Sequence, residues 1–246
     1  MPQLGQHLAH PVDGRFRGTT LAEIVLVGRF DREATLPAAR FTGVPEVALI
    51  LWAVFGLFGF AGRILIQLRT TGSTGVVAVG GTGGAIEWLS GGLFLGSLAA
   101  GVLAAVFQLR GDIEPVSGLD ARGAQVAGLA LYATGLAGVL GSQLAMGRSW
   151  RIGVPEEPTE LVTGGPFALV RNPIYTAMIV AVAGLGLLAP NALSLASVIG
   201  LIAALELQVR FAEEPQLLRS HRDQYAAYAR RVGRFIPGLG LLRPKT

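Results

Sequence analysis

Five apolar runs follow one another from residue 44 onward, and they constrain the fold more than any other feature of the sequence. Three of them approach the ~20 residues that a helix needs to cross the hydrocarbon core of a bilayer. The last two are shorter and are separated only by Pro190-Asn191, which predicts a tight helical hairpin. The predicted spans are 44–61, 86–107, 124–146, 174–189 and 192–209. The sequence therefore predicts an all-α, polytopic membrane protein of about five transmembrane helices.

The composition supports membrane embedding. Of the 246 residues, 51% are hydrophobic and 15% are charged, whereas a soluble domain carries about 25% charged residues. The net charge of +4 is distributed over loops, which argues against a nucleic-acid partner. Because the chain has no cysteine, disulfides, thiolate nucleophiles and cysteine-based metal sites are excluded, and we predict no metal site.

We expect three regions along the chain. Residues 1–43 are polar and mixed in charge, and segment 21–30 is either a short amphipathic helix on the membrane surface or part of a poorly ordered tail. Residues 44–146 form a three-span membrane scaffold, whose glycine and alanine content suits close helix packing in lipid. Residues 147–246 combine a loop, the helical hairpin and a charged C-terminal segment.

The arginines predict an orientation. With five spans, one side of the membrane holds seven arginines and the other holds twelve arginines and Lys245. Positive charge concentrates on the cytoplasmic side of membrane proteins. The second side, which includes the loop 147–172 and the C-terminal segment, is therefore expected to face the cytoplasm. The first long apolar run starts only near Val44, so the pattern of a cleaved signal peptide is absent.

The loop before the hairpin carries a distinctive turn and helix start. A Gly164-Gly165-Pro166 turn is followed by Arg171-Asn172-Pro173, and an apolar run begins at once. Asn172 is a plausible N-cap, and Pro173 stands in the first turn, where proline is tolerated. The free N–H groups of such a helix start, with Arg171 beside them, suit an anionic group.

Beyond the last span, the helical pattern continues into the charged segment. Glu206, Arg210 and Glu213 share one helical face. Because a carboxylate at the end of an apolar run is costly, Glu206 either has a functional role or a buried partner, or it pairs with Arg210 at the interface. Glu213 and Glu214 by themselves would indicate a solvated helix start, but the nearby Arg-Asn-Pro-x-Tyr motif indicates a shared site.

These motifs together resemble the isoprenylcysteine carboxyl methyltransferase family, which includes phospholipid methyltransferase relatives. The resemblance covers residues 147–238 and rests on the order and spacing of five motifs. They are Leu161-Val-Thr-Gly-Gly-Pro-Phe167, Val170-Arg-Asn-Pro-Ile-Tyr175, Glu213-Glu214-x-x-Leu217, Tyr225-x-x-Tyr228 and Val232-x-Arg-Phe-Ile-Pro237. By this resemblance, residues 147–246 are the methyltransferase core, and the protein belongs in the plasma (inner) membrane of a bacterium.

The resemblance implies S-adenosyl-L-methionine as methyl donor and a lipophilic acceptor that arrives from the bilayer, with O-methylation of a carboxylate or hydroxyl as the expected reaction. The cofactor contacts that it implies are Thr159, Glu160, Leu161, Val162, Phe167, Asn172, Pro173, Ile174, Tyr175 and Glu213. The candidate catalytic residues are Arg171, Glu206, Arg210 and Glu214. A carboxylate acceptor needs no general base, whereas a hydroxyl or amine acceptor does, and Glu206, Glu214 and His221 are the candidates for it.

Three positions depart from the family pattern. Asn172 stands where the family usually has histidine, and Phe167 stands where it usually has tyrosine. Asparagine keeps a hydrogen-bonding side chain but carries no proton, and phenylalanine keeps the aromatic ring but loses the hydroxyl. Val209 occupies the place of a substrate-contacting arginine, with Arg210 one step later, so a prenylcysteine carboxylate as substrate does not follow from the resemblance.

Two other functions remain open at this stage. Membrane sterol and steroid reductases carry a similar C-terminal stretch and bind NADPH there, although a diphosphate calls for more cationic side chains than Arg171 and Arg210 supply. A non-enzymatic membrane scaffold or sensor would bind no cofactor. The oligomeric state does not follow from the sequence.

Overall fold

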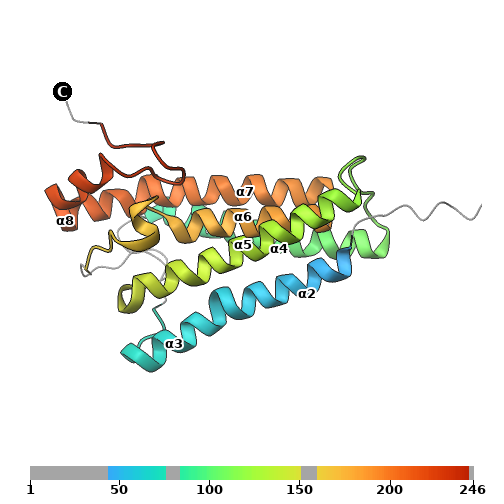
Figure 1. Cartoon of the computed structure of the whole chain (residues 1–246), viewed down its shortest axis with the longest axis horizontal. Helices are drawn as coiled ribbons and strands as arrows, with labels where there is room; N and C mark the ends of the chain where they lie inside the picture. The colour runs from blue at the N-terminus through green and yellow to red at the C-terminus, as the bar shows by residue number, and fades with distance from the viewer. Residues whose placement is uncertain (1–43, 76–83, 151–159, 244–246) are drawn as a thin grey trace, which may run out of the picture. The chain divides into compact units, whose positions relative to one another are not determined.

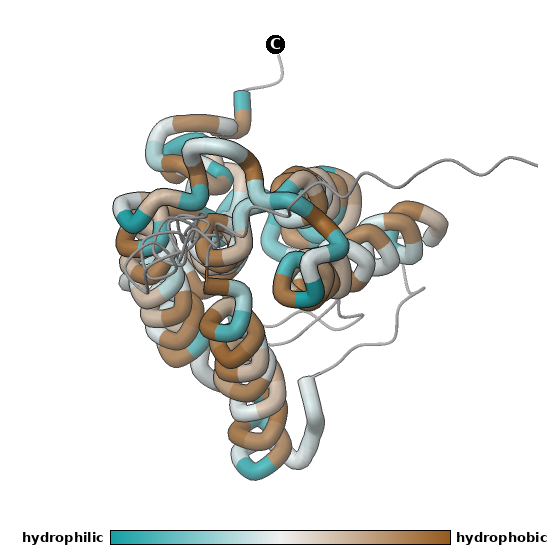
Figure 2. Tube along the Cα trace, turned by 90° about the vertical axis from the view of Figure 1, so that its right-hand side faces the viewer, coloured by the Kyte–Doolittle hydropathy of each residue, from teal (hydrophilic) through white to brown (hydrophobic). Residues whose placement is uncertain are grey.

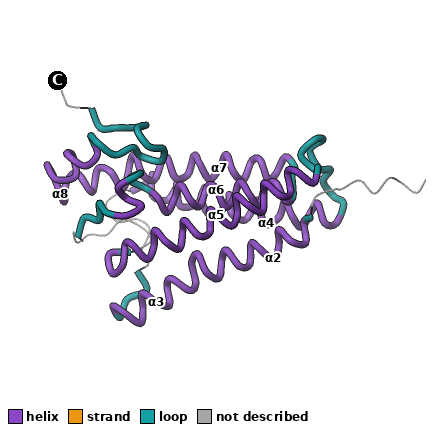
Figure 3. Tube along the Cα trace, viewed as in Figure 1, coloured by secondary structure: helices purple, strands orange, loops and turns teal. Residues whose placement is uncertain are grey.

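The computed structural model describes residues 44–75, 84–150 and 160–243, and these are helices joined by loops (Figures 1 and 3). All of them belong to one compact unit. The predicted surface helix over 21–30 and the cofactor contact Thr159 lie outside the described residues. The predicted all-α, polytopic fold is confirmed for the part of the chain that is described.

The first span is longer than the sequence predicts. Helix α2 (Pro45–Phe55), a π-helical turn (Gly56–Ala61) and α3 (Gly62–Thr71) together form 27 residues of helix. The helix was expected to end at Arg63, but the Arg63 side chain is buried. It donates from Nη2 to the Gly147 carbonyl, and its guanidinium lies 5.0 Å from the Trp150 ring centroid. Because the Arg63 guanidinium has these partners, Arg63 can stay inside the helix, and the helix continues to Thr71.

Four further helices complete the membrane part. They are α4 (Gly84–Arg110), α5 (Arg122–Met146), α6 (Pro173–Leu188) and α7 (Ala192–Gln208). Four helical stretches are long and apolar enough to cross a membrane, and α6, with 16 residues, is apolar but shorter. Hydrophobic residues fill the helices, while hydrophilic residues gather at their ends and in the loops (Figure 2). The predicted five spans thus correspond to four long helices and one short one.

Two helix pairs hold the hairpin in place, because α5 packs along α6 and α4 packs along α7. Glycine permits the closest approach. A Cβ atom on Gly128 would lie 2.8 Å from the Gly184 carbonyl oxygen, and one on Gly135 would lie 2.7 Å from the Ala177 carbonyl oxygen. In lipid, helices associate through such close van der Waals packing. The scaffold region and the C-terminal region therefore share one core.

The hairpin turn is fixed by Asn191, which caps α7. Its Oδ1 accepts a hydrogen bond from the Ser194 N–H at 3.0 Å, and its Nδ2 donates to the Ala104 carbonyl at 3.0 Å and to Gln108 Oε1 at 2.9 Å. The buried Asn191 amide thus bonds to the backbone of α4 and caps α7. This explains why asparagine stands where the short turn meets α7.

Helix α7 continues through a π-helical turn (Val209–Glu213) into α8 (Glu214–Ala229). The combined helix has 38 residues. At 1.5 Å per residue it measures about 57 Å, far more than the ~30 Å hydrocarbon core. The span therefore ends near Val209, where charged residues begin, and α8 extends beyond the membrane. This confirms the predicted helical continuation, although α8 is kinked at Arg222, where φ is 41°.

Candidate active site

The C-terminal tail folds back over the start of α6. The Arg171 N–H donates to the Gly233 carbonyl at 2.8 Å, and the Asn172 N–H donates to the Arg234 carbonyl at 3.1 Å. Gly233 is required for this approach, since a Cβ atom there would lie 2.8 Å from both the Gly238 nitrogen and the Leu239 oxygen. Two of the helix-start N–H groups that were expected to be free are thus bound by the tail.

Arg171 lies at the centre of this arrangement and is buried. Its Nη1 donates to the Ala229 and Val232 carbonyls, and its Nη2 donates to Glu214 Oε1 at 2.5 Å and to the Gly240 carbonyl at 3.0 Å. The guanidinium therefore joins the start of α6, the start of α8 and the tail. Its anionic partner is Glu214 of the same chain. The predicted catalytic role of Arg171 stays a prediction.

Glu214 accepts hydrogen bonds from two arginines. Besides Arg171, Arg234 donates from Nε to Oε1 at 2.8 Å and from Nη2 to Oε2 at 2.7 Å. Burial alone would raise the pKa of the Glu214 carboxyl, but the hydrogen bonds from Arg234 and Arg171 outweigh burial and hold its pKa below the ordinary value. The same hydrogen bonds raise the pKa of the Arg234 guanidinium. Glu214 is therefore ionised, and both of its carboxylate oxygens accept hydrogen bonds.

Asn172 stands at the N-cap position of α6, as predicted, but its side chain does not cap the helix. Its Nδ2 donates to the Arg234 carbonyl at 3.1 Å, and its own carbonyl accepts from the Thr176 hydroxyl. The asparagine amide thus holds the tail against the helix start. This contact uses a neutral donor, so it does not need the proton that a histidine would bring.

The Glu213 side chain has other partners than Glu214 and contacts Tyr175. The Tyr175 hydroxyl donates to Glu213 Oε1 at 2.6 Å. The Gln208 side chain also hydrogen-bonds to Glu213, and the Ser90 hydroxyl donates to Gln208 Oε1 at 2.6 Å. Two residues predicted as cofactor contacts, 38 positions apart in sequence, are therefore joined.

Ser90 and Gln208 were not predicted from the sequence. Both are polar residues inside apolar runs, and this was the available signal, because a polar side chain in a span is costly unless it finds a partner. Their contact brings α4 to the same end of the hairpin as Glu213.

The remaining predicted cofactor contacts lie in the loop before α6 and in the first turn of α6. Phe167, in a short 3-10 turn (Gly165–Ala168), is buried, and its carbonyl accepts from the Tyr228 hydroxyl at 2.5 Å. Leu161 packs against Tyr225 and Tyr228 of α8. Val162 is half-buried, Glu160 is exposed, Pro173 is buried, and Ile174 packs on the membrane core. The structure thus brings the described members of the set to one end of the α6–α7 hairpin.

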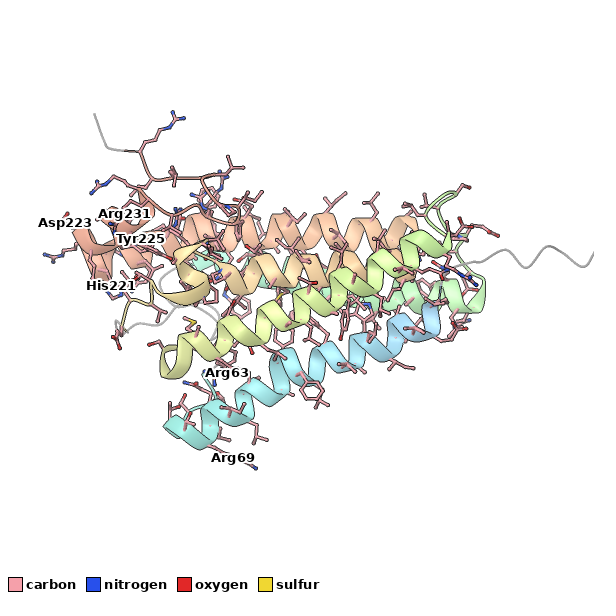
Figure 4. The ribbon with its side chains drawn as sticks, in the orientation of Figure 1. Arg63, Arg69, His221, Asp223, Tyr225 and Arg231 are labelled. Atoms are coloured by element: carbon pink, nitrogen blue, oxygen red, sulfur yellow. The ribbon has the colours of Figure 1, made fainter. Side chains whose placement is uncertain are left out.

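The other two catalytic candidates, Glu206 and Arg210, lie at the end of α7 and in the π-helical turn after it. Arg210 donates from Nε to Glu206, which agrees with the ion-pair interpretation of Glu206. His221 is half-buried and lies on α8 near Asp223 and Tyr225, whereas Arg63 and Arg69 lie at the α3 end (Figure 4). Val209 is buried.

One part of the chain matches a known family model. Residues 124–224 match the model described as phospholipid methyltransferase. The match runs from α5 through the hairpin into α8, so Arg171, Tyr175, Glu213 and Glu214 all lie inside it. It confirms the resemblance inferred from the sequence.

Two curated relatives match nearly half of the chain. The nickel-cobalt-cadmium resistance protein NccN of Alcaligenes xylosoxydans xylosoxydans is 33% identical over 119 residues, which are 48% of this chain and 54% of that protein. The cobalt-zinc-cadmium resistance protein CzcN of Cupriavidus metallidurans is 36% identical over 110 residues, which are 43% of this chain and 50% of that protein. The chain thus spans about half the length of the curated relatives it matches. Among the described residues, no group of three or more His, Asp or Glu side chains is arranged to hold a metal ion.

One solved structure has a similar fold. It is the eukaryotic intramembrane Ras methyltransferase ICMT (isoprenylcysteine carboxyl methyltransferase), with a TM-score of 0.57 at 20% sequence identity. The likeness covers 83% of this chain and 70% of that chain. At this identity, the likeness shows a common polytopic helical fold.

Proposed function

We propose that the chain is an integral-membrane methyltransferase that uses S-adenosyl-L-methionine to methylate a lipophilic acceptor, with the site on the cytoplasmic side. The observation that carries this proposal is the hydrogen bond between Tyr175 and Glu213. It joins the Arg-Asn-Pro-x-Tyr helix start to the charged helix after the hairpin, inside the matched region 124–224. These are the two segments to which the family resemblance assigns the cofactor.

The side chains at this end of the hairpin fit such a cofactor by their chemistry. S-adenosylmethionine carries an ammonium group, for which the Glu213 carboxylate is a suitable acceptor. Its adenine ring and its sulfonium suit aromatic faces, which Tyr175 and Phe167 provide. When bound, it supplies a methyl group attached to a positively charged sulfur. The residues of this chain would then orient the two reactants and exclude water, since methyl transfer depends mainly on alignment and desolvation.

The ion pairs of the site favour a carboxylate as the acceptor group. Glu206 is paired with Arg210, and Glu214 is paired with Arg171 and Arg234. Glu214 is a weak base, because the hydrogen bonds from Arg234 and Arg171 hold its pKa below the ordinary value. A carboxylate acceptor is already ionised at neutral pH and needs no base, whereas a hydroxyl does. We therefore propose O-methylation of a carboxylate that arrives from the bilayer.

The test is thermal stability of the detergent-purified chain, titrated separately with S-adenosylmethionine, S-adenosylhomocysteine and NADPH. A ligand that binds only the folded state adds ~2.7 kcal/mol of stability at one hundred times its dissociation constant. We expect a shift with the first two compounds and none with NADPH. A shift with NADPH alone would reject the proposal in favour of a membrane reductase.

A further inference from the structure

Four arginines line an open groove between the end of α7 and the C-terminal tail. The groove has a volume of about 720 Å³, and the residues 238–242 form the rest of its wall together with Arg210, Arg230, Arg234 and Arg243. All the charged side chains of this lining are basic. Neither Tyr175 nor Glu213 belongs to the lining of the groove.

Two of the four arginines carry positive charge that no described carboxylate balances. Arg210 is paired with Glu206, and Arg234 is paired with Glu214. Arg230 and Arg243 are exposed and form no ion pair with the described acidic residues. A guanidinium offers a planar set of donors that matches a phosphate group. The groove therefore attracts a phosphate-bearing anion.

The tail adds backbone donors to the same wall. Gly238 and Gly240 adopt positive φ angles of 76° and 72°. Within the described residues, their N–H groups donate to no other backbone carbonyl. The tail therefore offers two backbone hydrogen-bond donors in addition to the guanidinium groups.

The position of the groove relates it to the membrane surface. Arg210 follows directly after the apolar α7 segment, and Arg234 Nη1 lies 4.0 Å from Glu206 Oε2, which keeps the tail beside the end of α7. Exposed apolar side chains belong to the same segments: Leu239 of the lining by 60%, Phe211 next to Arg210 in sequence by 55%, and Ile236 of the tail by 56%. Basic side chains beside exposed apolar ones are typical of a surface that meets both lipid headgroups and acyl chains.

We propose that this groove binds the phosphate-bearing headgroup of an anionic phospholipid at the membrane surface, as a site separate from methyl transfer. The arginines and the tail N–H groups bind the phosphate, while Phe211, Ile236 and Leu239 contact the acyl chains. The apolar rim distinguishes a lipid from a free phosphate or a soluble phosphorylated cofactor, neither of which gains from it.

Native mass spectrometry of the detergent-purified full chain tests this proposal. Phosphatidylglycerol, phosphatidylcholine, inorganic phosphate and NADPH are titrated separately, and bound ligand is counted. The test variant is the double substitution Arg230→Gln/Arg243→Gln. Its matched control is Arg219→Gln/Arg231→Gln, which removes the same charge from two exposed arginines outside the groove. A third variant, Arg230→Lys/Arg243→Lys, keeps the charge.

We expect wild-type protein and control to bind phosphatidylglycerol at least about tenfold more tightly than phosphatidylcholine, and the test variant to lose this preference. The lysine variant should retain most of the preference, because lysine still binds phosphate as a point charge. The proposal is wrong if the test variant keeps the preference, or if the control loses it equally, which indicates general charge attraction. Inorganic phosphate or NADPH binding as tightly as phosphatidylglycerol would also overturn the lipid assignment. None of these outcomes depends on S-adenosylmethionine binding.

Discussion

Glu213 and Glu214 are neighbours in sequence, but their side chains belong to two different networks. Glu213 accepts a hydrogen bond from Tyr175 in the first turn of α6, whereas Glu214 accepts hydrogen bonds from Arg171 and from Arg234 of the tail. Neighbouring side chains on a helix point in directions about 100° apart, because a helix has ~3.6 residues per turn, so the two carboxylates can meet different partners. The same residue type therefore serves ligand binding at one position, as we propose, and structure at the next.

The Glu213→Ala variant should lose binding of S-adenosylmethionine while it remains folded and extractable. The variant loses the proposed acceptor for the ammonium group, but its structural cost is limited to the hydrogen bonds of Tyr175 and Gln208, at about 1 kcal/mol each. Ligand-induced thermal shift is the measurement. Glu46→Ala, at an exposed glutamate in the first turn of α2, is the control. Normal cofactor affinity in Glu213→Ala would show that this residue makes no cofactor contact.

The Glu214 carboxyl predicts a pH dependence of stability. Its pKa is lowered in the folded state, so its contribution is fully present above the unfolded pKa of about 4.3 and is lost as the pH falls through the lower folded pKa. Glu214→Gln should cost about 3 kcal/mol at neutral pH, because it leaves the buried Arg171 and the half-buried Arg234 without their anion. Melting temperatures between about pH 6 and about pH 3.5 should fall less steeply in the variant. Equal slopes in both proteins would contradict the assignment.

Among the helices, the pairing of α5 with α6 depends on small residues. Gly135 lies against the backbone of α6 at Ala177 and Ala181, so this face of α5 has no space for a methyl group. Gly141, on the same helix, has no neighbouring atom within 4 Å of a Cβ position. Substituting each glycine by alanine changes helix propensity by the same amount. The two variants therefore differ only in the packing that the new methyl group meets.

Gly135→Ala should destabilise the protein by about 1–3 kcal/mol, the usual cost of overpacking. Gly141→Ala should be neutral or stabilising by up to about 1 kcal/mol, since alanine favours helix. Thermal unfolding in one detergent compares them. If the two variants unfold alike, the close contact between α5 and α6 is absent.

The molecule as a whole combines a membrane helix bundle with a polar cap built from α8, the loop before α6 and the tail. The cap is held by hydrogen bonds from Arg171, Asn172 and Tyr228 to backbone carbonyls and by a small apolar cluster around Tyr225 and Tyr228. The bundle instead has a continuous apolar core around Trp52, Tyr132 and Leu185. The two parts should therefore respond differently to damage in the tail.

Gly233→Ala tests this separation. Its new methyl group would meet the backbone of the tail, so the tail should leave the start of α6 and cofactor binding should fall by at least about tenfold. The bundle should keep its helical circular dichroism signal in detergent. Gly238→Ala is the control for a substitution in the tail, because a Cβ atom there meets nothing within 4 Å, although its positive φ of 76° makes it mildly strained. Loss of helical signal in Gly233→Ala would mean that the cap and the bundle fold as one unit.

The sequence by itself determined the parts of the protein that depend on local pattern. Apolar run length specified the spans, because a helix in lipid must satisfy its own backbone over a fixed thickness. Asn172 and Pro173 specified the start of α6, and the motif spacing specified the family. The division into regions 1–43, 44–146 and 147–246 stays a prediction.

Only the tertiary structure decided which partner each polar group takes. Arg171 and the start of α6 have the chemistry of an anion site, yet tail carbonyls and Glu214 accept from the two terminal guanidinium nitrogens and from the Arg171 and Asn172 N–H groups. Ser90 donates to Gln208, 118 positions away in sequence, and Gln208 in turn hydrogen-bonds to Glu213. Arg63 stays inside its helix because it contacts the Gly147 carbonyl and the Trp150 ring. Such choices depend on which segments meet in space. A buried polar group takes whatever partner the packing brings within about 3 Å, and sequence distance does not enter into that selection.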